Sequence, residues 1–173
     1  VSSVEILIDR NPQEIEPITP VQLDTSPGSP LMLSDRGVYR INGSASIPIA
    51  GASTHVLKLE PSSIALFEES ETLALVNLEG LHIASLQSNN SNLIDPREQL
   101  LTPHFDADGY LWSVGSTGAI NVFRDGQLSQ LVGSESELRL DFALSPEGSR
   151  FAEIVVIDDV SRLQIRGVIR DSE

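Results

Sequence analysis

The stretch LLTPHFDADGYLWSVGSTGAINVFRDGQLSQLV, residues 100–132, decides the fold. It contains three turn sequences, DADG at 106–109, GSTG at 115–118 and RDG at 124–126. Each includes a glycine, which can adopt the positive φ that tight hairpin turns require. The runs between the turns are apolar, β-branched or aromatic, as strands commonly are. Four antiparallel strands within these 33 residues are typical of one blade of a β-propeller.

Similar strand–turn–strand segments recur along the chain at 31–41, 64–76, 104–114 and 142–155. A glycine ends the turn in three copies (Gly37, Gly109 and Gly148), and the second copy has Glu71 there. The intervals of 34, 38 and 39 residues indicate an array of similar units. The sequence therefore predicts an all-β fold. We expect a partial β-propeller of about four antiparallel four-stranded blades, the last incomplete.

Three segments are predicted along the chain. Residues 1–11 include the strand-like run VEILI and are interpreted as the terminal strand of a preceding domain. Residues 12–30 hold five prolines and are interpreted as a linker, because a strand with that proline spacing could lie only at a sheet edge. Residues 31–173 form the partial propeller.

Composition excludes several classes of partner and site. The chain has 11 Lys and Arg against 25 Asp and Glu, a net charge of −14, which argues against nucleic acid and anionic lipid surfaces as partners. It has no cysteine, so disulfides, zinc–thiolate sites and cysteine nucleophiles are excluded. No run of 18 apolar residues and no signal peptide is present, and the opening VSSVEILIDRN suggests a mature form or a piece of something longer.

An array of three complete blades and one incomplete blade should expose an apolar blade face. Closure of the ring normally removes such faces and the unpaired edges beside them. We therefore expect that the chain is a fragment, that another copy completes it, or that it forms an open array.

No residue pattern points to a metal site. The histidines His55, His82 and His104 share no ligand spacing and are interpreted as polar residues in or beside strands. His82 should face the opposite side of its strand from its two apolar neighbours. The DADG sequence begins like a calcium loop, but glycine comes at the fourth position and Thr117 stands where an EF-hand needs glutamate. We interpret DADG as a turn.

The remaining candidates are also interpreted as structural. Trp112, the single tryptophan, should pack between blades. Residues 145–148, SPEG, should form a turn rather than a nucleophile site. The adjacent carboxylates Glu68 and Glu69, and Asp158 and Asp159, are interpreted as loop charges because neighbouring side chains point apart. Accordingly, no catalytic, cofactor-binding or metal-binding residue is predicted, and no cofactor.

Two segments resemble the β-propeller domain of the LpqB family of actinobacterial lipoproteins. In that family a P-x-x-D-x-x-G-x-x-W strand pair precedes an S-P-D-G-x-R-x-A pair and a hairpin with R-L and V-x-R-D. The matching residues here are Pro103, Asp106, Gly109 and Trp112, then Ser145, Pro146, Gly148, Arg150 and Ala152, then Arg162, Leu163, Arg170 and Asp171. Glu147 replaces the usual aspartate. The opening residues are similar to the end of the GerMN-type domain that precedes the propeller in this family.

This resemblance implies a function. It implies a non-enzymatic propeller scaffold of an exported lipoprotein, held on the outer face of the cell membrane by a lipid anchor absent from this chain. The implied partner is the extracellular domain of a sensor histidine kinase, MtrB-like, for which the lipoprotein is an accessory. The alternative is a ligand-binding module, or a lyase or hydrolase, acting at the axial channel of the propeller.

Overall fold

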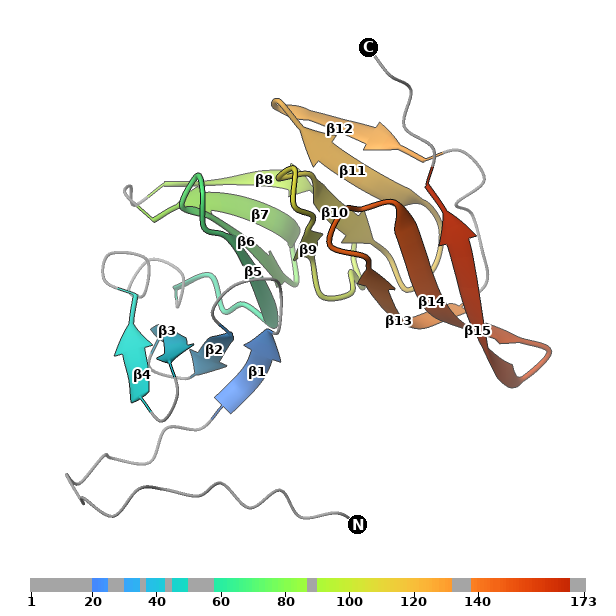
Figure 1. The fold of residues 1–173 in the computed structure, drawn as a ribbon, viewed down its shortest axis with the longest axis horizontal. Coiled ribbons are helices and arrows are strands. Elements are labelled where there is room, and N and C mark those ends of the chain that lie inside the picture. The colour runs from blue at the N-terminus through green and yellow to red at the C-terminus, as the bar shows by residue number, and fades with distance from the viewer. Residues whose placement is uncertain are drawn as a thin grey trace.

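The structure is a computed structural model that describes residues 20–24, 30–34, 37–42, 45–49, 58–86, 90–131 and 138–168. The described strands form four antiparallel sheets that follow one another in chain order (Figure 1). Within each sheet, consecutive strands are hydrogen-bonded neighbours. The predicted all-β partial propeller is confirmed, and each sheet is called a blade, numbered 1 to 4 along the chain.

The strand bounds show three four-stranded blades and one three-stranded blade. Blade 1 consists of β1 (Pro20–Asp24), β2 (Leu31–Ser34), β3 (Gly37–Asn42) and β4 (Ala45–Pro48). Blade 2 consists of β5 (Ser63–Phe67), β6 (Thr72–Asn77), β7 (Gly80–Ser85) and β8 (Ser91–Asp95). Blade 3 consists of β9 (His104–Phe105), β10 (Leu111–Val114), β11 (Ile120–Arg124) and β12 (Gln127–Gln130). Blade 4 consists of β13 (Leu138–Leu144), β14 (Arg150–Ile157) and β15 (Val160–Gly167).

The first strands of successive blades lie beside one another, since β1 contacts β5 and β5 contacts β9. Side chains between blades form three apolar cores. Leu33 and Val38 of blade 1 pack with Leu75 of blade 2, and Leu81 of blade 2 packs with Leu111 of blade 3. The third core joins blades 3 and 4. The blades are therefore stacked face to face through apolar side chains, which is how a propeller buries its sheets.

The first blade begins earlier than the sequence predicts. Strand β1 lies within the segment interpreted as a linker, and it pairs with β2 in blade 1. It is an edge strand with a proline at its first residue, and an edge strand tolerates proline. The prolines therefore make the strand difficult to recognise in the sequence, but they do not prevent it from forming. Residues 1–11 and 12–19 lie outside the described residues, so the domain boundary stays a prediction.

This strand also corrects the phase of the repeat. The segment 31–41 supplies the second and third strands of its blade, whereas the other three segments supply the first and second strands. Second strands begin at Leu31, Thr72, Leu111 and Arg150, at intervals of 41, 39 and 39 residues. The true period is therefore more uniform than the intervals between turn glycines, and Gly37 belongs to a different turn from Gly109 and Gly148.

The predicted DADG and SPEG turns are confirmed. Gly109 N donates to Asp106 O at 3.0 Å, and Gly148 N donates to Ser145 O at 2.8 Å. Both glycines have positive φ, 79° and 62°. The two turns also meet, because Ala107 N donates to the Pro146 carbonyl at 2.8 Å.

Candidate functional site

One end of the array is formed by the connectors between blades and the turns between second and third strands. We call this end the connector face, and it comprises residues 58–62, 77–80, 96–101, 115–119 and 158–159. Backbone hydrogen bonds join each connector to the end of a second strand, from Ser62 N to Val76 O of β6 and from Leu101 N to Val114 O of β10, both at 2.8 Å. Glu60 and Gln99, two residues before these donors, both have positive φ, 49° and 56°. The same local geometry therefore recurs in blades 2 and 3.

A buried aspartate organises the connector between blades 2 and 3. Asp95, at the end of β8, accepts hydrogen bonds from Arg97 Nη2 at 2.6 Å and from Ser113 Oγ at 2.5 Å. Arg97 also donates to the Ala119 carbonyl at 2.5 Å. Burial would raise the pKa of Asp95, but the Arg97 and Ser113 hydrogen bonds outweigh it, so the pKa lies below its ordinary value. This carboxylate is ionised and holds two blades together.

A second ionic cluster lies between blades 3 and 4. Arg139 Nε donates to Glu153 Oε2 at 2.7 Å, and both side chains are fully buried. Arg139 Nη1 donates to the Gly118 carbonyl at 2.5 Å, and Arg139 N donates to the Ser116 carbonyl at 2.5 Å. The other Glu153 oxygen lies 2.8 Å from Nη2 of the half-exposed Arg166.

The two clusters converge on one turn. Residues 115–119, which join β10 to β11, accept hydrogen bonds from Arg97 on one side and from Arg139 on the other. Guanidinium groups suit this role because they donate several hydrogen bonds in fixed directions. Asp95 and Glu153 compensate the charges of the two guanidinium groups. These interactions therefore hold the turn in place and leave no free charge there for binding or catalysis.

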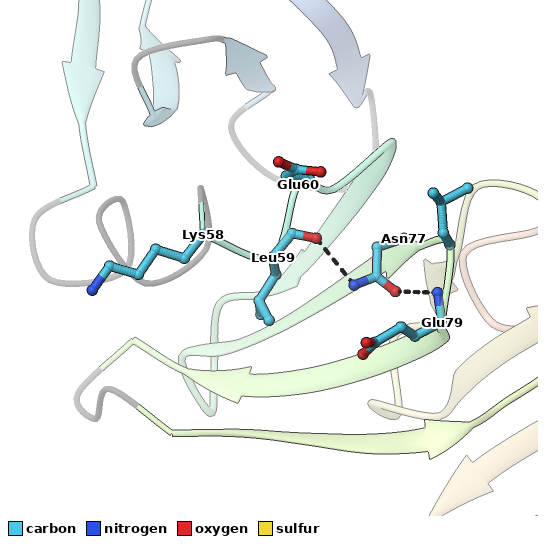
Figure 2. A pocket seen from close by; sticks show the side chains of 6 residues that line it. Lys58, Leu59, Glu60, Asn77 and Glu79 are labelled. Carbon is cyan, nitrogen blue, oxygen red and sulfur yellow. Dashed lines mark hydrogen bonds between the residues drawn. The ribbon is translucent and has the colours of Figure 1, made fainter.

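An open cleft lies on the connector face beside blade 2 (Figure 2). Its volume is about 270 Å³, and it is lined by Lys58, Leu59, Glu60, Asn77, Leu78 and Glu79. Asn77 braces it, donating to the Leu59 carbonyl at 3.0 Å and accepting from Glu79 N at 2.9 Å. Glu60 and Glu79 lie on opposite sides of the hydrogen bond between Leu59 and Asn77, and the side chain of Lys58 points away from both carboxylates.

Leu78 is the most exposed apolar residue at this cleft, with 93% of its surface accessible. It stands at the tip of the turn between β6 and β7, next to the exposed carboxylate of Glu79. A large apolar side chain held out by a braced turn and flanked by carboxylates suits contact with a partner that has an apolar pocket and basic residues. The cleft around Leu78 is therefore the candidate functional site.

The described histidines do not meet. His82 is buried on β7, and its side chain faces away from the core that contains Leu81 and Ile83, as predicted. Its Nε2 lies 3.7 Å from Glu79 Oε2. Burial lowers the pKa of His82, and Glu79 opposes this only in part. His104 packs edge-on against Phe142, with ring centroids 4.8 Å apart. His55 lies outside the described residues.

Trp112 packs between blades 3 and 4, as predicted. It is 1% exposed and stacks on Phe151 with a centroid separation of 5.9 Å. Its Nε1 donates to Asp106 Oδ2 at 3.0 Å, and the other oxygen of Asp106 accepts from the backbone of Asp108 and Tyr110. Asp106 thus fixes its own turn and the tryptophan together.

Sequence reasoning missed both ionic clusters. Arg139 lies between Leu138 and Leu140, an alternation that would place the arginine in solvent. The structure does the opposite, with Arg139 1% exposed and the leucines 45% and 50% exposed. Arg97 follows a strand end and resembles an ordinary loop charge. The one sequence feature that could have indicated a buried ion pair is the position of Arg139 inside a strand of a chain with few basic residues.

The described residues show neither a metal-binding cluster nor a membrane-spanning helix. Within those residues, no group of three or more His, Cys, Asp or Glu side chains is arranged to hold a metal ion. Among the same residues, no helix has the length and apolar character needed to span a membrane.

A family model described as the lipoprotein LpqB β-propeller domain matches residues 37–173. No curated protein matches the sequence.

Several solved structures share the fold. The chain is similar to Kuenenia stuttgartiensis hydrazine synthase, with 13% identity and a TM-score of 0.56 over 91% of this chain and 49% of that chain. It is also similar to Kluyveromyces lactis Hsv2, with 16% identity and a TM-score of 0.52 over 87% and 49%. For TolB from Acinetobacter baumannii the identity is 12% and the TM-score 0.52, over 84% and 37%. The chain spans about half or less of the length of these structures, and the likeness shows the fold alone.

Proposed function

Because this chain belongs to the LpqB family of lipoproteins, through the β-propeller domain that matches residues 37–173, we propose that it is a non-enzymatic protein-interaction scaffold. Its buried carboxylates support this proposal. Asp95, Asp106 and Glu153 each accept a hydrogen bond from an arginine, serine or tryptophan side chain. Asp95 joins blade 2 to blade 3, and Asp106 and Glu153 hold side chains within blades 3 and 4, whereas general acid–base work needs carboxyl groups that converge on a substrate.

The partner in this proposal is the extracellular domain of a sensor histidine kinase of the MtrB type. The lipoprotein is exported, is anchored to the outer face of an actinobacterial cell membrane, and acts as an accessory of this two-component system. The resemblance to the LpqB family supports this role. The excess of acidic residues favours a partner surface rich in Lys and Arg.

The exposed Leu78 carries the assignment of the contact site. The Asn77 side chain holds this turn, because it donates to the Leu59 carbonyl and accepts a hydrogen bond from Gly80 N. A leucine on such a fixed turn presents apolar surface at little cost in conformational entropy. The carboxylates of Glu60 and Glu79 line the same cleft and outnumber its one cationic side chain, Lys58, so the cleft would steer a basic partner and fix its orientation.

This proposal is tested by measuring, with biolayer interferometry, the binding of the lipoprotein to the extracellular domain of the sensor. We expect the lipoprotein to bind, and Leu78→Ser to weaken binding about 10-fold or more if the side chain is an anchor. Leu93→Ser is the matched control, because Leu93 is an exposed leucine of the same blade that lies away from the cleft, and it should leave binding unchanged.

Two results would overturn different parts of the proposal. Failure of the full-length lipoprotein to bind the sensor domain would reject the accessory role. Equal binding by the wild type and the Leu78→Ser variant would keep the scaffold and reject this cleft as its contact site.

A further inference from the structure

The end of the blades opposite the connector face carries the turns between first and second strands. The turns of blades 3 and 4 are joined there, because Ala107 N donates to the Pro146 carbonyl, and both are the second residues of their turns. Glu69 is the second residue of the turn in blade 2. In the described residues, no corresponding backbone hydrogen bond runs from Glu69 N to the turn of blade 3. An open cleft lies between the turns of blades 2 and 3.

This cleft combines aromatic and acidic residues. It has a volume of about 280 Å³, and it is lined by Phe67 and Phe105 together with Glu68, Glu69 and Asp106. Small-molecule sites typically measure about 300–1,000 Å³ and enclose most of the ligand. A smaller, open cleft suits a single side chain of a partner better than a free small molecule.

The two phenylalanines form a fixed apolar wall. Their rings stack with centroids 5.6 Å apart. Phe67 also lies against the turn of blade 3, since a Cβ built at Gly109 would be 2.7 Å from its ring. Phe105 is buried and Phe67 is half-buried, so the wall keeps some accessible apolar surface. A long basic side chain can pack its methylene groups on such a surface while its charged end stays in water.

The carboxylates of the cleft are only partly compensated by basic residues. Asp106 is buried, and its oxygens accept hydrogen bonds from Trp112 and from its own turn. Glu68 and Glu69 are exposed, and Glu68 Oε1 lies 3.4 Å from Nη2 of Arg40. Glu69 forms no ion pair with any other described residue. The cleft therefore has an excess of negative charge, which attracts a cation.

The chain already combines a guanidinium group with a ring and a carboxylate elsewhere. The guanidinium carbon of Arg124 lies 4.6 Å from the centroid of the Tyr110 ring, and its Nε lies 3.0 Å from Asp125 Oδ2. Arginine suits such a site better than lysine, because its planar group packs on rings and donates to carboxylates in fixed directions. The cleft offers the same two kinds of contact through Phe67 and Glu69.

We propose that the cleft lined by Phe67, Glu69 and Phe105 binds one arginine side chain from a basic segment of a protein partner. The methylene groups of the arginine pack on the two phenylalanines, and its guanidinium group pairs with Glu69. This contact does not depend on the sensor partner, and it lies at the opposite end of the blades from Leu78.

NMR titration of the 173-residue chain tests this contact. The probe is a capped glycine–serine peptide that carries one arginine. The matched control peptide carries citrulline in its place, which has nearly the same shape without the charge. We expect saturable shifts of the amide signals of Phe67, Glu69 and Ala107 with the arginine peptide, and none with the citrulline peptide.

Charge variants locate the contact. Glu69→Gln should weaken binding of the arginine peptide about 2- to 5-fold, as expected for one exposed ion pair. Glu69→Lys should weaken it further, because like charges then meet. Glu98→Gln and Glu98→Lys are the controls, since Glu98 is exposed on the connector between blades 2 and 3 and these variants change the net charge equally. Both controls should leave the affinity unchanged.

Three results would overturn the proposal. The first is the absence of saturable shifts at these amides with the arginine peptide at about 10 mM, a concentration that detects even millimolar affinity. The second is equal binding of the citrulline peptide, which would show that the charge is not recognised. The third is equal weakening by the Glu69 and Glu98 variants, which would show non-specific attraction to an acidic protein. None of these results bears on binding of the sensor domain.

Discussion

Replacing Arg139 with methionine should destabilise the chain more than any surface substitution. The change leaves Glu153 buried without its fully buried partner, and it removes the donor from the Gly118 carbonyl. Breaking a buried ion pair on one side typically costs about 3–5 kcal/mol. Arg166 still neutralises the other oxygen of Glu153, so the lower end, about 3 kcal/mol, is expected.

This loss is large relative to the whole fold. Domains are typically stable by about 5–15 kcal/mol, and in a domain of this size 3 kcal/mol lowers Tm by about 6–12 °C. The assay is urea unfolding followed by tryptophan fluorescence. Trp112 is the single tryptophan and lies in the same interface, stacked on Phe151, so its emission reports on this contact.

Two further variants test whether the Arg139–Glu153 ion pair causes this loss of stability. Arg166→Met removes a half-exposed partner of Glu153 and should cost about 1 kcal/mol or less. The double variant Arg139→Met with Glu153→Leu should be more stable than the sum of the two single losses predicts, by about 1 kcal/mol or more, because it leaves no buried charge unpaired. A loss below about 1 kcal/mol for Arg139→Met, or strict additivity in the double variant, would refute the role of the pair.

Three further outcomes are expected. Gly109→Ala should lower the free energy of unfolding by about 1–3 kcal/mol more than Gly126→Ala. Both glycines have φ near 80°, but of the two only Gly109 would place the new Cβ against a side chain, at 2.7 Å from the Phe67 ring. Chemical denaturation of both variants measures the difference. Trp112→Phe should cost about 2 kcal/mol through the lost hydrogen bond to Asp106, measured by circular dichroism, and an unchanged midpoint would contradict it. His82 has a lowered folded pKa, so its contribution to stability is present above the unfolded pKa of 6.5 and declines as pH falls below it. The loss of stability between about pH 7.5 and about pH 5.5 should therefore be smaller in His82→Gln, and equal losses would show that this histidine is not responsible.

Turn chemistry and periodicity were sufficient to predict blades 2, 3 and 4. Gly109 and Gly148 mark equivalent turns, and the apolar runs on either side of them become the strands of blades 3 and 4. These features are local, because a hairpin is specified by residues close in sequence. Strand β1 was missed for a local reason too, since its prolines are tolerated only because it lies at an edge.

The connections between blades could not be predicted in the same way. Arg139 meets the carbonyl of Gly118, 21 residues earlier, and Arg97 meets that of Ala119, 22 residues later. Nothing in the local pattern of either arginine specifies a carbonyl that far away. The alternation of Leu138, Arg139 and Leu140 was misleading, because it reverses the usual relation between polarity and solvent. Those leucines are exposed on a blade that has a neighbour described on one side only.

The face-to-face stacking of the blades has a consequence for how the protein melts. The three cores that the structure describes each join two consecutive blades, so the chain behaves as a one-dimensional lattice with nearest-neighbour coupling. An interior unit such as blade 3 is held through two couplings and a terminal unit through one. Amide hydrogen exchange should then be slower in the central strands of blades 2 and 3, which are β6, β7, β10 and β11, than in blades 1 and 4. A stability measured on four blades is thus a property of that number of units, and it should rise with each blade added.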